Sequence, residues 1–149
     1  MYYIGMIEDD EAEASSVMAS LVINTKQLCE ESFKLYDLVK KASFREELFE
    51  QILNDIKENN IQGLIVDYKL DTLDEVMEGI EVVKFMHEEV PEFPVIILTD
   101  VPEKSKENDK ADPDKVYAKE IFMKPGELET QEMVYHIVRN LERYAKRRS

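Results

Sequence analysis

Five side chains that phosphoryl-transfer chemistry uses follow short apolar runs in this sequence. Glu8 and Asp9 follow the first run, Asp67 the second, Thr99 the third and Lys124 the fourth. Neighbouring carboxylates attract a hard divalent cation such as Mg²⁺, and a carboxylate beside that cation can become a nucleophile and form an aspartyl-phosphate. A hydroxyl and an ammonium group can then hold the remaining phosphoryl oxygens. These residue types predict magnesium-dependent phosphoryl chemistry at Asp67.

The apolar runs before these side chains are typical of buried parallel strands. In chain order they cover residues 3–7, 63–66, 95–98 and 121–123. A further stretch, 32–38, alternates apolar and polar residues and is typical of an edge strand. Ligands of an open parallel sheet bind beyond the carboxyl ends of its strands. We therefore expect the chemically active side chains to lie together along one edge of a sheet.

Apolar residues at helical spacing predict helices between these strands. The first covers about residues 11–22, the second runs from 44 to about 58, the third covers about 80–89, and the last runs to the chain end. The region 101–119 has no clear apolar stripe, and we expect a loop there, followed by a short helix from Pro113 to Lys119. Alternating strands and helices predict a doubly wound α/β fold, formed by one domain over residues 1–149.

The composition limits the classes of protein. The chain has 149 residues, 44% hydrophobic and 35% charged, as expected of one soluble globular domain. Its net charge of −14 disfavours nucleic acids and anionic membranes as partners. The single cysteine, Cys29, excludes an intramolecular disulfide, and the absence of a long apolar run argues against a membrane span, so we expect a cytoplasmic protein. Only four glycines are present, which argues against a glycine-rich nucleotide-binding loop.

Four motifs, taken together, resemble the receiver domain of two-component response regulators, the CheY-like superfamily. They are Met6-Ile7-Glu8-Asp9-Asp10, Leu64-Ile65-Val66-Asp67, Ile96-Ile97-Leu98-Thr99 and Phe122-Met123-Lys124-Pro125. The resemblance spans nearly the whole chain. It implies a flavodoxin-like (βα)5 sandwich with a parallel five-stranded sheet of order 2-1-3-4-5.

The resemblance also implies a set of Mg²⁺ ligands. Asp9 would bind the cation directly, and Glu8 would act largely through water. Asp67 and the backbone carbonyl of Lys69 would complete the protein's contribution.

Asp67 would be the phosphoacceptor on the same resemblance, with Thr99 and Lys124 contacting the phosphoryl group. The donor would be the phosphohistidine of a histidine kinase or phosphotransfer protein, and slow hydrolysis would follow. We expect no output domain in the chain, so a stand-alone receiver would signal by contact with an effector protein. Apart from slow self-dephosphorylation, no enzymatic activity is expected.

Several positions depart from the family pattern. Asp71 occupies the place of a usual proline, Gly79 comes late, Asp100 replaces a small residue, and Ile121 replaces a switch aromatic. These departures leave open an alternative, a degenerate receiver that serves as a phosphorylation-independent protein-interaction module.

A second alternative is a magnesium-dependent phosphohydrolase that uses Asp67 as its nucleophile. Such enzymes commonly place a second acid close after the nucleophile, whereas this chain has Lys69 there. The sequence therefore favours the switch over the hydrolase.

Overall fold

The computed structural model describes residues 2–8, 10–36, 44–67, 69–70, 77–99, 116–118, 120 and 127–148. The elements in chain order are β1 (Ile4–Ile7), α1 (Glu11–Asn24), the 3-10 helix η1 (Glu30–Ser32), β2 (Phe33–Leu35), α2 (Phe44–Lys57), β3 (Gly63–Asp67), β4 (Lys69–Leu70), β5 (Met77–Glu78), α3 (Gly79–Glu89), β6 (Val95–Thr99), β7 (Val116–Ala118) and α5 (Leu128–Arg148).

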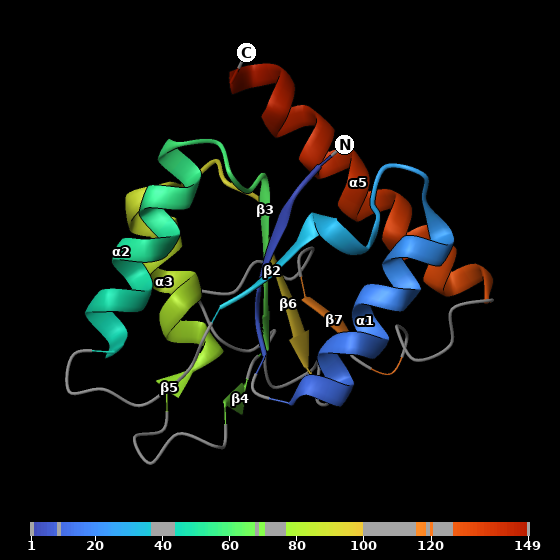
Figure 1. Ribbon diagram of the computed structural model, residues 1–149, viewed down its shortest axis with the longest axis horizontal. Coiled ribbons are helices and arrows are strands. Elements are labelled where there is room, and N and C mark those ends of the chain that lie inside the picture. The colour runs from blue at the N-terminus through green and yellow to red at the C-terminus, as the bar shows by residue number, and fades with distance from the viewer. Residues whose placement is uncertain are drawn as a thin grey trace.

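The fold has three layers. A parallel five-stranded sheet of order β2-β1-β3-β6-β7 forms the middle layer (Figure 1). Helices α2 and α3 cover one face of the sheet, and α1 and α5 cover the other (Figure 1). The predicted flavodoxin-like α/β fold and its strand order 2-1-3-4-5 are therefore confirmed, counting only the strands of this sheet.

The central strands lie where the apolar runs predicted them. Every residue of β1, β3 and β6 is buried, as expected of parallel strands that are covered on both faces. The predicted helices at 11–22, 44–58 and 80–89 correspond to α1, α2 and α3. Helix α2 ends before Asn59, whose φ of 60° is a left-handed conformation that asparagine tolerates well. The edge strand β2 is shorter than the predicted 32–38.

The prediction for the region before Lys124 is partly wrong. A short helix was expected to reach Lys119, but residues 116–118 form β7, which pairs in parallel with β6. Tyr117 is buried in the core under α1 and α5, and the pairing with β6 satisfies backbone groups of β7. The strand expected at 121–123 lies outside the described residues, and the fifth strand of the sheet is β7.

A two-stranded antiparallel pair, β4 and β5, lies between Asp67 and α3 and was not predicted. Lys69 pairs with Glu78, and Leu70 pairs with Met77. The pair lies at the end of the molecule to which the strands of the main sheet point (Figure 1).

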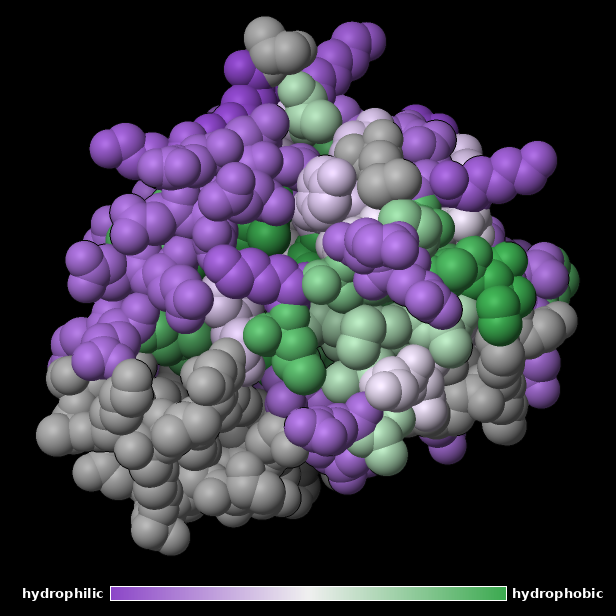
Figure 2. All heavy atoms as spheres, viewed as in Figure 1, coloured by the Kyte–Doolittle hydropathy of each residue, from purple (hydrophilic) through white to green (hydrophobic). Residues whose placement is uncertain are grey.

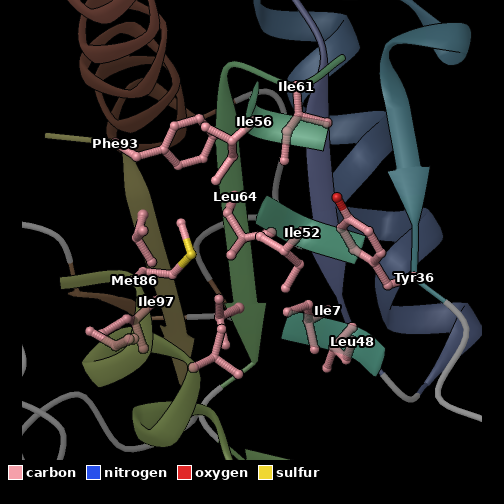
Figure 3. Close-up of a cluster of buried hydrophobic side chains, with 14 residues drawn as sticks. Ile7, Tyr36, Leu48, Ile52, Ile56, Ile61, Leu64, Met86, Phe93 and Ile97 are labelled. Carbon is pink, nitrogen blue, oxygen red and sulfur yellow. The ribbon is translucent and has the colours of Figure 1, made fainter. Parts of the chain in front are cut away.

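Two hydrophobic cores hold the layers together. The core under α2 and α3 gathers residues of both helices and of the sheet, including Ile52, Leu64 and Ile97 (Figure 3). The core under α1 and α5 includes Leu21 and Leu141 with the opposite face of the sheet. Replacing one of the fully buried aliphatic side chains with alanine typically costs about 2–5 kcal/mol.

Two glycines allow close packing on opposite faces of the sheet. A Cβ atom at Gly63 would overlap Cδ2 of Leu141 in α5, so the Leu141 side chain would have to shift. A Cβ atom at Gly5 would lie 2.7 Å from Cε2 of Tyr36. The missing side chains of Gly63 and Gly5 thus leave room for the side chains of Leu141 and Tyr36.

The last turn of α5 also contacts α2. The Arg148 guanidinium donates a hydrogen bond of 2.6 Å to the backbone carbonyl of Lys57, the last residue of α2. A helix leaves its last carbonyls without partners inside the helix, and Arg148 satisfies one of them.

The surface is dominated by polar side chains, with local exceptions. Figure 2 shows hydrophilic residues over α2 and the C-terminal end of α5, and hydrophobic or near-neutral residues over β2 and α1. Among the described residues, no helix is both long enough and apolar enough to cross a membrane.

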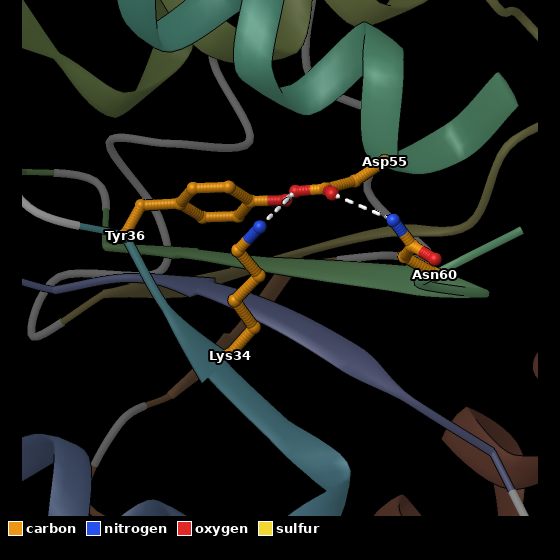
Figure 4. A network of polar contacts seen from close by, with 4 residues as sticks. All are labelled: Lys34, Tyr36, Asp55 and Asn60. Atoms are coloured by element: carbon orange, nitrogen blue, oxygen red, sulfur yellow. Dashed lines mark hydrogen bonds and ion pairs between the residues drawn. The ribbon is translucent and has the colours of Figure 1, made fainter. Parts of the chain in front are cut away.

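A polar network that is buried at Tyr36 and Asp55 and exposed at Lys34 joins β2 to α2. The Asp55 carboxylate accepts hydrogen bonds from Lys34 Nζ at 2.6 Å, from the Tyr36 hydroxyl at 2.8 Å and from Asn60 Nδ2 at 3.1 Å (Figure 4). The Lys34 ammonium also lies 5.3 Å from the centre of the Tyr36 ring. This network anchors the edge strand to the end of α2.

The network shifts the pKa values of two of its members. Burial raises the pKa of Asp55, but the hydrogen bonds from Lys34, Asn60 and Tyr36 and the charge of Lys34 outweigh burial, and the pKa is lowered overall. Burial, followed by the hydrogen bond to Asp55 and the charge of Asp55, raises the pKa of Tyr36. Asp55 therefore stays ionised and Tyr36 stays neutral at ordinary pH.

Candidate functional site

Two strand ends bring the first pair of acids together. Strands β1 and β3 are neighbours, and their register pairs Ile7 with Val66. Glu8 directly follows β1 and Asp67 is the last residue of β3, so they lie side by side at the carboxyl edge of the sheet. Both side chains are buried, with 7% and 6% of their residue surface exposed.

The alternation along the strands directs both acids to the same face. Met6 and Ile65 belong to the core under α1 and α5. Side chains two positions apart on a strand share a face. Glu8 therefore points to the same face as Met6, and Asp67 to the same face as Ile65, which is the face covered by α1. Burial of the preceding apolar residues thus fixes the side of the sheet on which the acids lie.

Asp10 begins α1 and connects it to Glu8. Its side-chain Oδ1 accepts hydrogen bonds from the backbone N–H groups of Ala12 and Glu13, at 2.9 and 3.1 Å, which is the usual geometry of a helix N-cap. The Asp10 N–H donates to Oε1 of Glu8 at 3.1 Å. Asp10 therefore stabilises the start of α1 and also orients the Glu8 carboxylate.

Glu13, from the first turn of α1, completes a group of three carboxylates with Glu8 and Asp67. Each of these residues offers one carboxylate oxygen, and the three oxygens lie within 4.8 Å of one another. Glu13 is half-buried, whereas Glu11 in the same turn is exposed. Glu13 is not among the predicted ligands, because an acid in the first turn of a helix is common and is stabilised there by the helix dipole.

Thr99 lies at the end of the strand next to Asp67. Strand β6 pairs with β3, Asp67 stands opposite Leu98, and Thr99 is the following residue. Only 4% of the Thr99 surface is exposed. The structure thus brings Glu8, Asp67 and Thr99, three of the predicted site residues, to one edge of the sheet.

The roles of all the predicted site residues stay predictions, and the structure gives no side-chain position for three of them. Asp9 and Lys124 lie outside the described residues. Lys69 begins β4, two residues beyond Asp67, and the proposed use of its backbone carbonyl as a ligand is not tested by this position. Asp71, Asp100 and Ile121, the departures from the family pattern, also lie outside the described residues.

The donor set fits a hard divalent cation. Carboxylate oxygens from β1, α1 and β3 converge, and hard cations such as Mg²⁺ and Ca²⁺ prefer oxygen ligands. The N-terminus of α1 is a source of positive potential at the same place, which helps to hold acids together before a cation binds. Glu8, Glu13 and Asp67 could therefore hold the cation.

Comparisons with known proteins agree with this architecture. No protein-family model and no curated protein matches the sequence. Among solved structures, the chain resembles the response regulator DrrB of Thermotoga maritima, an OmpR/PhoB homolog, with a TM-score of 0.58 and 23% identity. It also resembles the response regulator RcsB of Salmonella typhimurium, whose structure was described in relation to DNA interaction, with a TM-score of 0.53 and 17% identity.

The matches extend over nearly the whole of this chain but not over the whole of the other proteins. They cover 96% of this chain and 54% of DrrB, and 95% of this chain and 67% of RcsB. At these identities the likeness establishes the fold, and the chain has the receiver fold of response regulators.

Proposed function

We propose that this chain is a receiver that acts as a Mg²⁺-dependent aspartyl-phosphate switch in the cytoplasm. Asp67 would accept a phosphoryl group from a histidine kinase or phosphotransfer protein, and the phosphorylated form would signal by contact with an effector protein. One observation carries the proposal. The carboxylates of Glu8, Glu13 and Asp67 meet at the carboxyl edge of a sheet with the receiver fold.

The proposed step is a direct phosphoryl transfer. A carboxylate oxygen of Asp67 attacks the phosphorus of a phosphohistidine, and a P–O bond forms as the P–N bond breaks. The imidazole keeps the electron pair of the broken bond and takes up a proton. In the later hydrolysis, water attacks the phosphorus, and inorganic phosphate and the Asp67 carboxylate are released.

The residues around Asp67 have distinct parts in this proposal. Bound Mg²⁺ would supply positive charge between the carboxylates and the phosphoryl oxygens. Glu8, oriented by the Asp10 N–H, and Asp9 would hold the cation. The Thr99 hydroxyl would donate a hydrogen bond to a phosphoryl oxygen, and the Lys124 ammonium would balance the charge of the acids.

The experiment is phosphorylation by a small phosphodonor. The protein is incubated with acetyl phosphate or phosphoramidate in the presence of Mg²⁺, and modification is followed by intact-mass spectrometry and peptide mapping. We expect one phosphoryl group on Asp67, and no modification when EDTA removes Mg²⁺ or when Asp67→Asn is used.

A matched control comes from the other buried aspartate. Asp55 is 5% exposed and Asp67 is 6% exposed, so Asp55→Asn makes the same chemical change at an equally buried site away from the acidic group. The Asp55→Asn protein should still be modified on Asp67.

The possible failures distinguish the alternatives. A folded wild-type protein that stays unmodified would overturn the switch and leave a phosphorylation-independent interaction module. Rapid multiple turnover of a phosphate ester, lost in Asp67→Asn, would instead identify a phosphohydrolase.

A further inference from the structure

We infer that Glu13 is an additional ligand of the divalent cation and helps to determine which cation the site prefers. This inference rests on the proposed function, because it concerns the cation of the same site. The receiver resemblance assigns Glu8, Asp9, Asp67 and the carbonyl of Lys69 to that cation, and Glu13 is outside this set.

The distances fit a single ion shared by all three described acids. Ligand oxygens lie about 2.0–2.1 Å from Mg²⁺ and about 2.3–2.6 Å from Ca²⁺. Two oxygens on opposite sides of one ion are therefore separated by roughly 4.2 Å for Mg²⁺ and roughly 5 Å for Ca²⁺. The carboxylate oxygens of Glu8, Glu13 and Asp67 lie within 4.8 Å of one another, so small side-chain rotations bring them onto a common ion.

The backbone holds Glu13 in a defined place. Its N–H donates to the N-cap Asp10, whose own N–H donates to Glu8. Two hydrogen bonds thus connect the backbone of Glu13 to the carboxylate of Glu8. The next residue of α1, Ala14, is fully buried in the core between this helix and the sheet, which limits rotation of the turn. Glu13 is therefore positioned by the same contacts that orient Glu8.

A further carboxylate changes the preference of a cation site. Mg²⁺ demands near-octahedral geometry, keeps several waters and is commonly held by one or two carboxylates, whereas Ca²⁺ accepts six to eight oxygens in flexible geometry. A third or fourth carboxylate at the site favours the larger ion. Glu13 should thus strengthen the binding of Ca²⁺ more than the binding of Mg²⁺.

The test compares two acids of the same helical turn. Glu13→Gln and Glu11→Gln remove the same charge, but Glu11 is exposed and is not part of the acidic group. Isothermal titration calorimetry with Mg²⁺ and separately with Ca²⁺ gives the affinities of the wild type and both variants. We expect Glu13→Gln to weaken Ca²⁺ binding about tenfold and Mg²⁺ binding less, and Glu11→Gln to change both by about twofold or less.

Two further measurements separate ligation from folding. Thermal unfolding in EDTA should show Glu13→Gln to be about as stable as the wild type, because the relief of repulsion from Glu8 and Asp67 offsets the loss of an acid that the dipole of α1 stabilises. Glu13→Asp keeps the carboxylate, and it should recover part of the Ca²⁺ affinity that Glu13→Gln loses.

The outcomes distinguish this inference from the proposed function. If the wild type binds neither cation, the metal-dependent switch itself fails. If the wild type binds Mg²⁺ and Glu13→Gln behaves like Glu11→Gln, the inference about Glu13 is wrong and the switch stands. A cation preference that is equal in the wild type and in Glu13→Gln also overturns the inference.

Discussion

Asp55 and Asp67 are equally buried, but different groups gather around them. Asp55 accepts hydrogen bonds from an ammonium, a phenol and an amide, all supplied by the chain (Figure 4). Asp67 lies within 4.8 Å of the carboxylates of Glu8 and Glu13. A buried charge is stabilised by opposite charges and by hydrogen-bond donors, and it is destabilised by like charges.

Asp55 serves the fold, whereas the carboxylates around Asp67 form the group that the proposed cation site requires. The surroundings of Asp55 lower its pKa despite burial, so its charge contributes to the attachment of β2 to α2. The grouping of Glu8, Glu13 and Asp67 concentrates negative charge at one edge of the sheet, where a cation would relieve it. Burial alone would not distinguish the two aspartates; the groups around them do.

The largest effect on stability is expected from Asp55→Ala. The change leaves the Tyr36 hydroxyl and the Lys34 ammonium without their acceptor, and breaking a buried ion pair typically costs about 3–5 kcal/mol. Because 43% of the Lys34 side chain is exposed, we expect a smaller loss of about 2–3 kcal/mol in the free energy of unfolding. Urea unfolding in EDTA measures this loss in the free energy of unfolding. An equal or larger loss in Asp67→Ala would contradict the comparison.

A smaller effect of opposite sign is expected from Glu8→Gln. The amide oxygen of Gln can still accept the Asp10 N–H, but one of three neighbouring negative charges is removed. We expect a net gain of about 1 kcal/mol in the free energy of unfolding in EDTA, because the relief of repulsion between buried like charges exceeds the weakening of the hydrogen bond from the Asp10 N–H. Excess Mg²⁺ should reduce or reverse the gain, because the wild type binds the cation more tightly. A loss of stability in EDTA would show that the chain itself balances the charge of Glu8.

The smallest effect is expected from Lys34→Met, and it should depend on pH. The ion pair with Asp55 is partly exposed, so we expect a loss of under about 1 kcal/mol at neutral pH. The folded-state pKa of Asp55 is lowered, so its stabilising contribution is complete above the unfolded-state pKa near 4 and is lost as pH falls through the folded-state pKa. The difference between wild type and Lys34→Met should therefore shrink from about pH 7 to about pH 2. A difference that stays constant over this range would show that Lys34 acts through packing on the Tyr36 ring instead.

Most of the sheet could be predicted from the sequence, because its central strands are apolar runs that are buried on both faces. The position of Glu8 and Asp67 at the ends of two such runs also predicted that they lie at the same edge of the sheet. The fifth strand could not be predicted in the same way. Val116–Ala118 is only three residues long, and its place depends on pairing with β6, a contact that local sequence does not encode.

The same reason explains which part of the candidate site was missed. The strand ends that carry Glu8, Asp67 and Thr99 are marked by the apolar runs before them. Glu13 lies on a helix, and its distance from Asp67 depends on how α1 crosses the edge of the sheet. The available signal was its position in the first turn after Asp10, which alone does not separate it from Glu11.

The hydrogen bond from Arg148 to Lys57 has a consequence for the order of folding. The two residues are 91 positions apart in the sequence, whereas the contacts within α2 and within α5 are local. Contacts between distant residues carry the entropy cost of closing a long loop before they are formed. We therefore expect the last carbonyl of α2 to receive this partner late, after the sheet between the two helices has brought them together.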